Sequence, residues 1–407
     1  MANKLELQRA LGREVAAYFT RRPEVSFIGF AGVGRHGGAL RLEEKDAGGQ
    51  LSRKLVVKYS LGAFSGDRYS DADEDLRNEY YWLGRLRNAE HIVQLVPFAD
   101  TSVNVPGISR GDENYEELLR RAKRRAEEEG SEEPADFGPP SVLQCPTFAL
   151  EYLPNGQLRT FVDRLSYDFR QYAPNRVLWR IWLCMVRQCV AMAFPPSQPA
   201  STDTGQKIRE VIRDGEKYCT LTQNSPHIEN WIFGDLQPSP DADHDPGVPI
   251  VKLIDFGRGR LRDPSEYVET MGVENAPECG SRINLRYHAT AMTEVCLPDC
   301  NRRQLQPARR PSTYNYTRNG QQFEVRTVAS SYLRDTEDLD LELRDILVRC
   351  LADRFEDVPP LKEVLEITEA AVANRGPNDN PELAVRMGVR EDDDYIKEFI
   401  QKVIFEA

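Results

Sequence analysis

The stretch that decides the fold is residues 219–260, CTLTQNSPHIENWIFGDLQPSPDADHDPGVPIVKLIDFGRGR. Its two short apolar runs, 231–233 and 250–254, are each bounded by turn-forming residues, which predicts a pair of strands. Asn230 stands directly before the first run, and residues 255–257 (Asp-Phe-Gly) follow the second. The predicted pair of strands therefore has an amide side chain at the head of one strand and a carboxylate at the end of the other.

Three glycines upstream, Gly32, Gly34 and Gly37, form a GxGxxG pattern between two predicted strands. A dinucleotide-binding fold requires a helix directly after such glycines, whereas residues 39–43 alternate like a strand. A glycine turn between two strands lets backbone N–H groups approach phosphates closely. We therefore expect a strand, a glycine turn and a second strand here, and the glycines alone are only a weak signal for a phosphate site.

A lysine and a glutamate further along form a candidate ion pair. Lys58 closes the apolar run 54–58, and Glu79 lies in a segment with helical apolar spacing. A lysine at a strand edge explains Lys58 taken alone, but a helix that carries Glu79 can hold its ammonium in a charge-assisted pair. Glu74 is the alternative partner on the same predicted helix.

The order of these motifs resembles that of the protein kinases. A strand that ends in Glu151, followed by a linker, is similar to the hinge between the family's two lobes, and residues 276–278 (Ala-Pro-Glu) stand where the family closes its activation segment. The resemblance covers roughly residues 25–370. The sequence around 230–257 is also similar to that of kinase-like proteins of filamentous fungi. It implies an α+β, bilobal fold, with a small antiparallel β-sheet lobe that carries one helix and a larger, mainly helical lobe.

Carried over residue by residue, the resemblance implies ATP and Mg²⁺ as cofactors. The residues implied to bind the nucleotide are Gly32, Gly34, Gly37, Lys58, Glu79, Glu151, Leu153 and Ile232. The residues implied to bind the metal are Asn230 and Asp255.

The catalytic set departs from the family pattern. The catalytic Asp of the family lies five residues before the metal-binding Asn, and here that position is Ser225. A neutral hydroxyl cannot accept a proton as a carboxylate does. Glu229 and His227, in the same loop, are the candidate substitute bases. The family's Arg position reads Asn224, so we expect no switching by loop phosphorylation through that residue.

A second alignment takes Asp235 as the base, in the sequence Gly-Asp-Leu-Gln-Pro at 234–238. Five residues on from Asp235 stands Pro240, whose side chain cannot bind a metal, and residues 241–247 contain no apolar run for the intervening strand. We therefore place Asp235 in the turn after the first strand. In the family, the Glu of Ala-Pro-Glu pairs with a distant Arg, and Arg354 is the expected substitute here.

Apolar periodicity predicts the remaining elements. We expect helices at 5–19, 177–194, 206–218, 341–351, 361–372 and 394–407, and a strand at 91–97. The resulting domain boundaries are an N-terminal helix in 1–24, a small lobe in 25–153 with a charged insertion at about 100–143, a large lobe in 154–372 and a tail with a final helix in 373–407.

Composition limits the function classes. Among 407 residues the net charge is −12, which argues against a nucleic-acid partner, and no apolar run reaches the length of a membrane span. The N-terminus lacks a signal core, and the eight cysteines include no CxxC pair, so we expect an intracellular protein, cytoplasmic or nuclear. Cys296, Cys300 and His288 lack a fourth ligand for a zinc site.

Two main functions follow as expectations. One is a pseudokinase that binds ATP and Mg²⁺ and acts on a protein partner as a nucleotide-dependent scaffold or regulator. The alternative is an active serine/threonine kinase, with a displaced base, that phosphorylates a protein substrate. A small-molecule phosphotransferase and a structural domain that binds no nucleotide are further alternatives.

Overall fold

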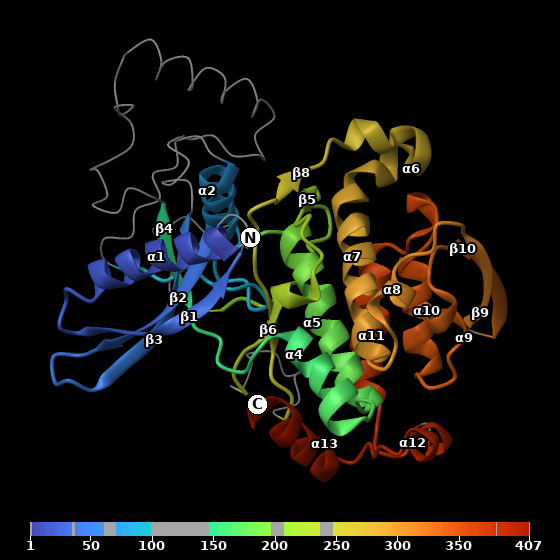
Figure 1. Ribbon diagram of the computed structural model, residues 1–407. Coiled ribbons are helices and arrows are strands. Elements are labelled where there is room, and N and C mark those ends of the chain that lie inside the picture. The colour runs from blue at the N-terminus through green and yellow to red at the C-terminus, as the bar shows by residue number, and fades with distance from the viewer. Residues whose placement is uncertain are drawn as a thin grey trace. The chain divides into compact units, whose positions relative to one another are not determined.

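The structure, a computed structural model, describes residues 2–34, 37–60, 71–98, 146–196, 207–236, 247–318, 320–379 and 381–406. The predicted charged insertion at 100–143 lies outside these residues. Within them the chain is α+β, as predicted, with a four-stranded antiparallel sheet and many helices (Figure 1). No helix in these ranges is both long enough and apolar enough to span a membrane.

The chain divides into two compact units. Unit 1 comprises Met1–Arg87, Val93–Tyr152 and Asp255–Leu261, and unit 2 comprises Asn88–Ile92, Leu153–Ile254 and Arg262–Ala407. The expected kinase-like bilobal arrangement of such units stays a prediction.

Unit 1 is built on the antiparallel sheet, in the order β1-β2-β3-β4. Its strands are β1 (Val25–Val33), β2 (Gly37–Lys45), β3 (Leu51–Ser60) and β4 (Thr147–Glu151), followed by a short β8 (Arg260–Leu261) outside this sheet. The register places Lys58 of β3 between Ala39 of β2 and Phe148 of β4. Lys58 therefore lies in a central strand, where both neighbours restrict its backbone.

The two faces of this sheet differ because strand residues alternate in direction. Leu55, Val57 and Tyr59 are buried on one face, which is covered by α1 (Ala2–Phe19) through Val15 and Phe19. Lys58 alternates with Val57 and Tyr59 along the strand, so its side chain points to the other face. Alternation along β3 thus separates an apolar face under α1 from a face that carries the lysine, whereas the sequence predicted only a short apolar strand here.

Helix α2 (Asp71–Arg85) belongs to the same unit and carries Glu79. Leu76, Trp82 and Leu83 are buried at helical spacing, and so is Glu79, of which only 2% is exposed. A carboxylate buried to that extent requires a partner. The partner is a residue of β3, described below.

Unit 2 is mainly helical and is organised around α5 (Asn175–Ala193), which is buried over nearly its whole length. The helices of this unit are α4 (Leu158–Asp163), α5, α6 (Val268–Asn275), α7 (Cys279–Cys296), α8 (Arg302–Leu305), α9 (Ser331–Asp335), α10 (Leu341–Cys350), α11 (Leu361–Asn374), α12 (Pro381–Met387) and α13 (Asp393–Ile400). Its short strands are β5 (Leu221–Thr222), β6 (Trp231–Phe233), β7 (Val251–Leu253), β9 (Ser312–Arg318) and β10 (Gln321–Thr327).

Most of the long predicted helices are confirmed. Helices α1, α5, α10 and α11 lie within a few residues of the predicted bounds. The C-terminal segment forms α13 and packs back on its own unit, where Phe399 contacts Phe161 with ring centroids 6.2 Å apart. These are the segments with the longest regular apolar spacing, which is the most reliable local signal.

Two predictions were wrong. Residues 91–97 form no regular strand, because Ile92 bridges to Leu253 of unit 2 while Leu95 bridges to Leu150 of unit 1. Residues 207–218 form no helix, since Ile208 makes a parallel bridge to Ala89 and Gly215 turns the chain at a φ of 81°. In both segments, distant backbone partners override local periodicity.

The hairpin of β9 and β10 was not predicted. The two strands pair in regular antiparallel register from Ser312 and Thr327 to Arg318 and Gln321. The sequence does carry a signal, because Asn319-Gly320 is a typical two-residue hairpin turn between alternating segments.

Gly12 determines how closely α1 approaches the sheet. A Cβ atom at this position would lie 2.5 Å from Phe30 Cε1 and 2.5 Å from Tyr59 Oη. Gly84, in α2, has open space at the corresponding place. The two glycines therefore form a matched pair for substitution by alanine.

We expect Gly12→Ala to lower the free energy of unfolding by about 1–3 kcal/mol, because the helix must move off the sheet. Gly84→Ala should instead raise it by about 0.5–1 kcal/mol through helix propensity. Urea denaturation followed by tryptophan fluorescence measures both. Stabilisation by Gly12→Ala equal to that by Gly84→Ala would contradict the close packing of α1.

Candidate functional site

The central feature of unit 1 is the ion pair between Lys58 on β3 and Glu79 on α2. Lys58 Nζ lies 2.7 Å from Glu79 Oε1 and 2.5 Å from Oε2. The lysine side chain is 22% exposed and that of the glutamate 3%. The predicted pair is therefore formed, with Glu79 and not Glu74 as the partner, and it holds the ammonium at the sheet surface.

Several carboxylates act electrostatically on this pair. Burial by itself lowers the pKa of Lys58, but the carboxylates of Glu79, Asp255 and Asp75 outweigh that effect and raise it. Burial also raises the pKa of Glu79, and Asp255 raises it further, against the attraction of Lys58. The ammonium of Lys58 is therefore kept in its charged form.

Helix α2 also holds the segment that follows Asp255. Asn78 Nδ2 donates to the carbonyl oxygens of Gly257 at 2.9 Å and Gly259 at 2.7 Å, and Trp82 Nε1 donates to Gly259 O at 3.1 Å. Consecutive residues of one helix therefore bind Lys58 and the Asp-Phe-Gly segment. Nothing in the spacing of the sequence indicated the role of Asn78.

The backbone of Asp255 is strained. Its φ is +65°, in the left-handed region that residues with a Cβ rarely adopt. Such conformations cost about 1–3 kcal/mol and cluster at functional sites. Gly257 N donates to Asp255 Oδ1 across 3.4 Å, a long bond within the same turn.

The glycine turn lies between β1 and β2 in the same unit. Gly34 N donates to Gly37 O at 2.8 Å, which closes the hairpin. Added Cβ atoms at Gly32 would meet nothing within 4 Å, whereas one at Gly37 would lie 2.5 Å from Tyr59 O. Gly37 is thus required by packing, while Gly32 leaves the turn open to a ligand.

Unit 2 positions the second predicted metal ligand, Asn230. The strands β6 and β7 pair as predicted, and Ile254 N donates to Asn230 O at 2.9 Å. Gln188 of α5 fixes both strands, because its Nε2 donates to Val251 O at 2.9 Å and its Oε1 accepts from Trp231 Nε1 at 2.7 Å. The central helix therefore sets the position of Asn230.

Asn230 and Ser225 are in direct contact. Asn230 Nδ2 donates to Ser225 O at 2.7 Å and lies 3.1 Å from Ser225 Oγ. Ser225 N in turn donates to Gln223 Oε1 at 2.9 Å. The loop is thus ordered around a hydroxyl, and no carboxylate replaces it at this position.

The neighbouring segment is held by two residues that the sequence analysis did not identify as ligands of the loop. Arg262 Nη2 donates to Asn224 Oδ1 at 2.7 Å, and Arg262 Nε donates to Thr222 Oγ1 at 3.2 Å. On α7, Asn284 Oδ1 accepts from Gln223 N at 3.2 Å. These contacts order the loop without a phosphate group.

The candidate bases lie elsewhere. Glu229 is 42% exposed and 3.9 Å from Arg302, and His227 is exposed. Asp235 is exposed just beyond β6, whereas Asn230 precedes that strand. Because a strand rises about 3.3 Å per residue, Asn230 before β6 and Asp235 after it lie at opposite ends of this strand. Asp235 follows the strand, as predicted, while the rest of the predicted turn, 237–246, lies outside the described residues.

The predicted hinge residues are divided between the units. Glu151 ends β4 in unit 1, where its N–H donates to Gln94 O at 3.0 Å and its Oε1 accepts from Gln94 N at 2.9 Å. Leu153 and Ile232 belong to unit 2. The N–H of Glu151 is therefore already used, and adenine recognition by these residues stays a prediction.

The structure brings together Lys58, Glu79 and Asp255 in unit 1, and Ser225 with Asn230 in unit 2. Asn230 and Asp255, the predicted metal pair, belong to different units and are linked through the chain, since Asp255 directly follows Ile254. Their sharing of a metal stays a prediction.

The prediction for the partner of Glu278 was wrong. Arg354 forms an ion pair with Glu356, while Glu278 Oε2 lies 3.1 Å from Arg282 Nη2, one turn further along. Arg282 Nη1 also donates to Val358 O. A local i,i+4 pair therefore replaces the long-range pair of the family pattern.

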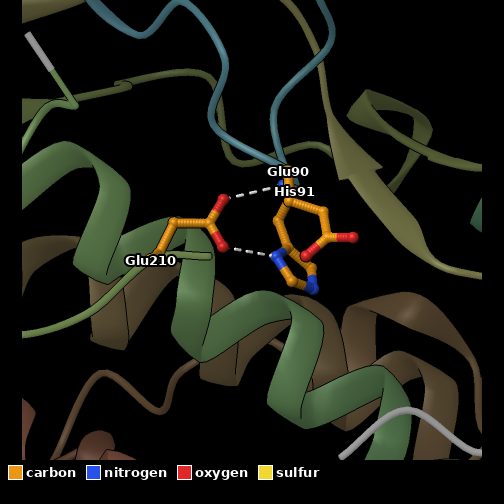
Figure 2. Close-up of side chains that lie close together, drawn as sticks. All are labelled: Glu90, His91 and Glu210. Carbon is orange, nitrogen blue, oxygen red and sulfur yellow. Dashed lines mark hydrogen bonds and ion pairs between the residues drawn. The ribbon is translucent and has the colours of Figure 1, made fainter. Parts of the chain in front are cut away.

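A buried cluster of Glu90, His91 and Glu210 is the one group among the described residues with three side chains spaced for a metal (Figure 2). Glu210 Oε2 lies 2.7 Å from His91 Nδ1, and Glu210 Oε1 accepts from His91 N at 2.8 Å. Burial lowers the pKa of His91, but Glu210 outweighs it and raises that pKa to about 10. A proton thus occupies the nitrogen that a metal would need, so the cluster is an ion pair that anchors residues 88–92 in unit 2.

His288 and the two cysteines considered for zinc do not form such a group in the described part of the chain. His288 Nδ1 lies 2.9 Å from Cys189 Sγ, and burial lowers the pKa of His288 to about 3. Burial also raises the pKa of Cys296. A neutral imidazole beside protonated thiols is core packing.

Comparison of the sequence with models of known protein families gives no match, and comparison with curated proteins gives none either.

The buried pair of His91 and Glu210 predicts a pH dependence. The raised pKa of His91 stabilises the fold fully below its unfolded pKa of about 6.5, and this contribution is lost as pH rises toward 10. The lowered pKa of Glu210 gives stability that is lost only in acid. We expect the free energy of unfolding to fall between pH 6.5 and 9.5 by roughly 1–3 kcal/mol more in the wild type than in His91→Gln. The free energy of unfolding at each pH is measured by urea denaturation. An equal fall with pH in the wild type and in His91→Gln would contradict the ion pair.

Proposed function

We propose that this chain is a protein-kinase-like domain that binds ATP with Mg²⁺ and acts as a pseudokinase, a nucleotide-dependent scaffold or regulator of a protein partner. The observation that carries the proposal is the buried Lys58–Glu79 pair, with Asp255 and Asp75 close enough to influence its charge. An ammonium held in place suits phosphate oxygens, and a carboxylate such as that of Asp255 is a ligand type that suits a divalent cation.

In the proposed site each residue has a distinct role. Glu79 orients Lys58, whose Nζ would donate to the α- and β-phosphates of the nucleotide. Asp255 and the side-chain oxygen of Asn230 would bind Mg²⁺, since Asn230 Nδ2 is used by Ser225. Mg²⁺, when bound, would neutralise phosphate charge. The open glycine turn at Gly32 and Gly34 would cover the phosphates.

The residues of the proposed site include no evident general base for phosphoryl transfer. Ser225, bonded to Asn230, stands where the resemblance places the catalytic carboxylate. Without a positioned general base, the rate of transfer is expected to fall by roughly 10²–10⁴-fold. Arg262 and Asn284 order the loop permanently, which supports a binding role rather than activation by phosphorylation.

The alternative, an active serine/threonine kinase, requires a substitute base. Glu229 is the candidate, because it is exposed in the same loop and its ion pair with Arg302 is long. Exposed pairs of this kind contribute little to stability, so the carboxylate is able to leave Arg302.

Nucleotide binding is tested by thermal shift with ATP, in the presence and absence of Mg²⁺. At about 100 times the dissociation constant, the ligand should stabilise the wild type by roughly 2.7 kcal/mol. Lys58→Met and Asp255→Asn should lose most of the increase in Tm, each compared with its own ligand-free Tm. Lys54→Met, on the same strand but 48% exposed, is the matched control and should keep the increase. An increase that persists in Lys58→Met would contradict this site.

Phosphoryl transfer is tested with radiolabelled ATP, Mg²⁺ and a panel of protein substrates. We expect no transfer above the Lys58→Met background, because the position of the base carries a hydroxyl. Transfer that Lys58→Met abolishes, and that Glu229→Gln reduces by roughly 10²-fold or more, would establish the active kinase instead.

A further inference from the structure

A second site lies in unit 1, on the face of the sheet opposite Lys58. It is a pocket of about 510 Å³ lined by Arg9, Arg13, Phe30, Ala31, Gly32 and Val33. Phe30 pairs with Leu40, a residue buried under α1, so the pocket belongs to the α1 face. Its volume falls in the range of small-molecule sites, which is about 300–1,000 Å³.

The two arginines give the pocket its charge. Arg9 and Arg13 are four residues apart on α1, so their side chains share one helix face, and both are exposed. Neither has an ion-pair partner among the described residues, and the pocket lining contains no carboxylate. In a chain with a net charge of −12, two exposed guanidinium groups at one pocket form a local positive field.

The backbone is shaped around this pocket. The pairing of β1 with β2 shifts register between Phe30 and Gly32, so Ala31 is a bulged residue at the end of an edge strand. Bulges re-aim side chains and are frequent beside functional sites. Gly12 lets α1 approach Phe30 closely, and this brings Arg9 and Arg13, on either side of Gly12, to the end of β1.

From this geometry we infer that the pocket binds a small soluble organic phosphate. Two guanidinium groups suit the oxygens of a phosphate monoester, which they bind through charge-assisted hydrogen bonds. Phe30, Ala31 and Val33 supply an apolar wall for the organic part. The pocket shares Gly32 with the proposed nucleotide site, but its arginines lie on the α1 face and Lys58 points to the other face of the sheet, so phosphate binding by Arg9 and Arg13 does not depend on Lys58.

The experiment uses the full chain and titrates para-fluorophenyl phosphate without Mg²⁺, followed by fluorine NMR. The wild type should bind, and Arg9→Gln/Arg13→Gln should bind about tenfold more weakly or worse, because both charges are removed. Arg21→Gln/Lys45→Gln removes the same charge from exposed positions of unit 1 outside the pocket and should bind as the wild type does. Binding should also weaken as salt rises from about 0.05 to 0.5 M.

Lys58→Met separates the two sites. Binding of the aryl phosphate should survive in this variant, whatever the outcome of the ATP titration. Loss in Lys58→Met with retention in Arg9→Gln/Arg13→Gln would assign the phosphate to the other face and overturn the inference. Binding of the aryl phosphate that is unchanged in both Lys58→Met and Arg9→Gln/Arg13→Gln would also overturn the inference.

A vesicle experiment distinguishes the source of the phosphate. Wild-type protein should not sediment with phosphatidylcholine vesicles that contain phosphatidylinositol bisphosphate. Sedimentation that Arg9→Gln/Arg13→Gln abolishes, without a fluorine shift for the soluble ester, would assign a lipid headgroup and overturn the small-molecule site. Thermal denaturation of each variant without ligand verifies that it is folded.

Discussion

The contact on which the proposed site depends is the ion pair of Lys58 and Glu79. Both side chains lose most of their contact with water where β3 meets α2. Their attraction therefore has to offset the cost of desolvating two charges. Here the carboxylates of Asp255 and Asp75 add to the attraction on the ammonium and help to keep it charged. A charged ammonium held in one position is what the proposed contact with phosphate oxygens requires.

In unit 2, side-chain contacts order the loop in which Ser225 stands at the position where the kinase resemblance would place a carboxylate. The amide of Asn230 binds Ser225, Arg262 binds Asn224, and Asn284 binds the backbone of Gln223. These are neutral or permanently charged groups whose bonds do not change between pH 5 and 9. The loop is therefore ordered whether or not chemistry takes place, as a binding domain requires.

The N-terminal helix connects packing with the second site. Without a side chain at Gly12, α1 lies close enough to Phe30 and Tyr59 to complete the core above the sheet. The same closeness brings Arg9 and Arg13 to the end of β1, beside the glycine turn. One packing constraint thus supports both the stability of unit 1 and the inferred phosphate pocket.

The sequence by itself determined the elements whose signal is local. Alternation in β2 and apolar spacing in α1, α5, α10 and α11 reflect burial of one face, and this can be counted along the chain. The pairing of Lys58 with Glu79 followed from motif order. Only the tertiary structure decided which polar groups meet: Asn78 with Gly259, Arg282 with Val358, and His91 with Glu210. These contacts, like the loss of the predicted strand at 91–97, depend on residues far away in the sequence, and a periodic pattern records how much of a segment is buried but not what it is buried against.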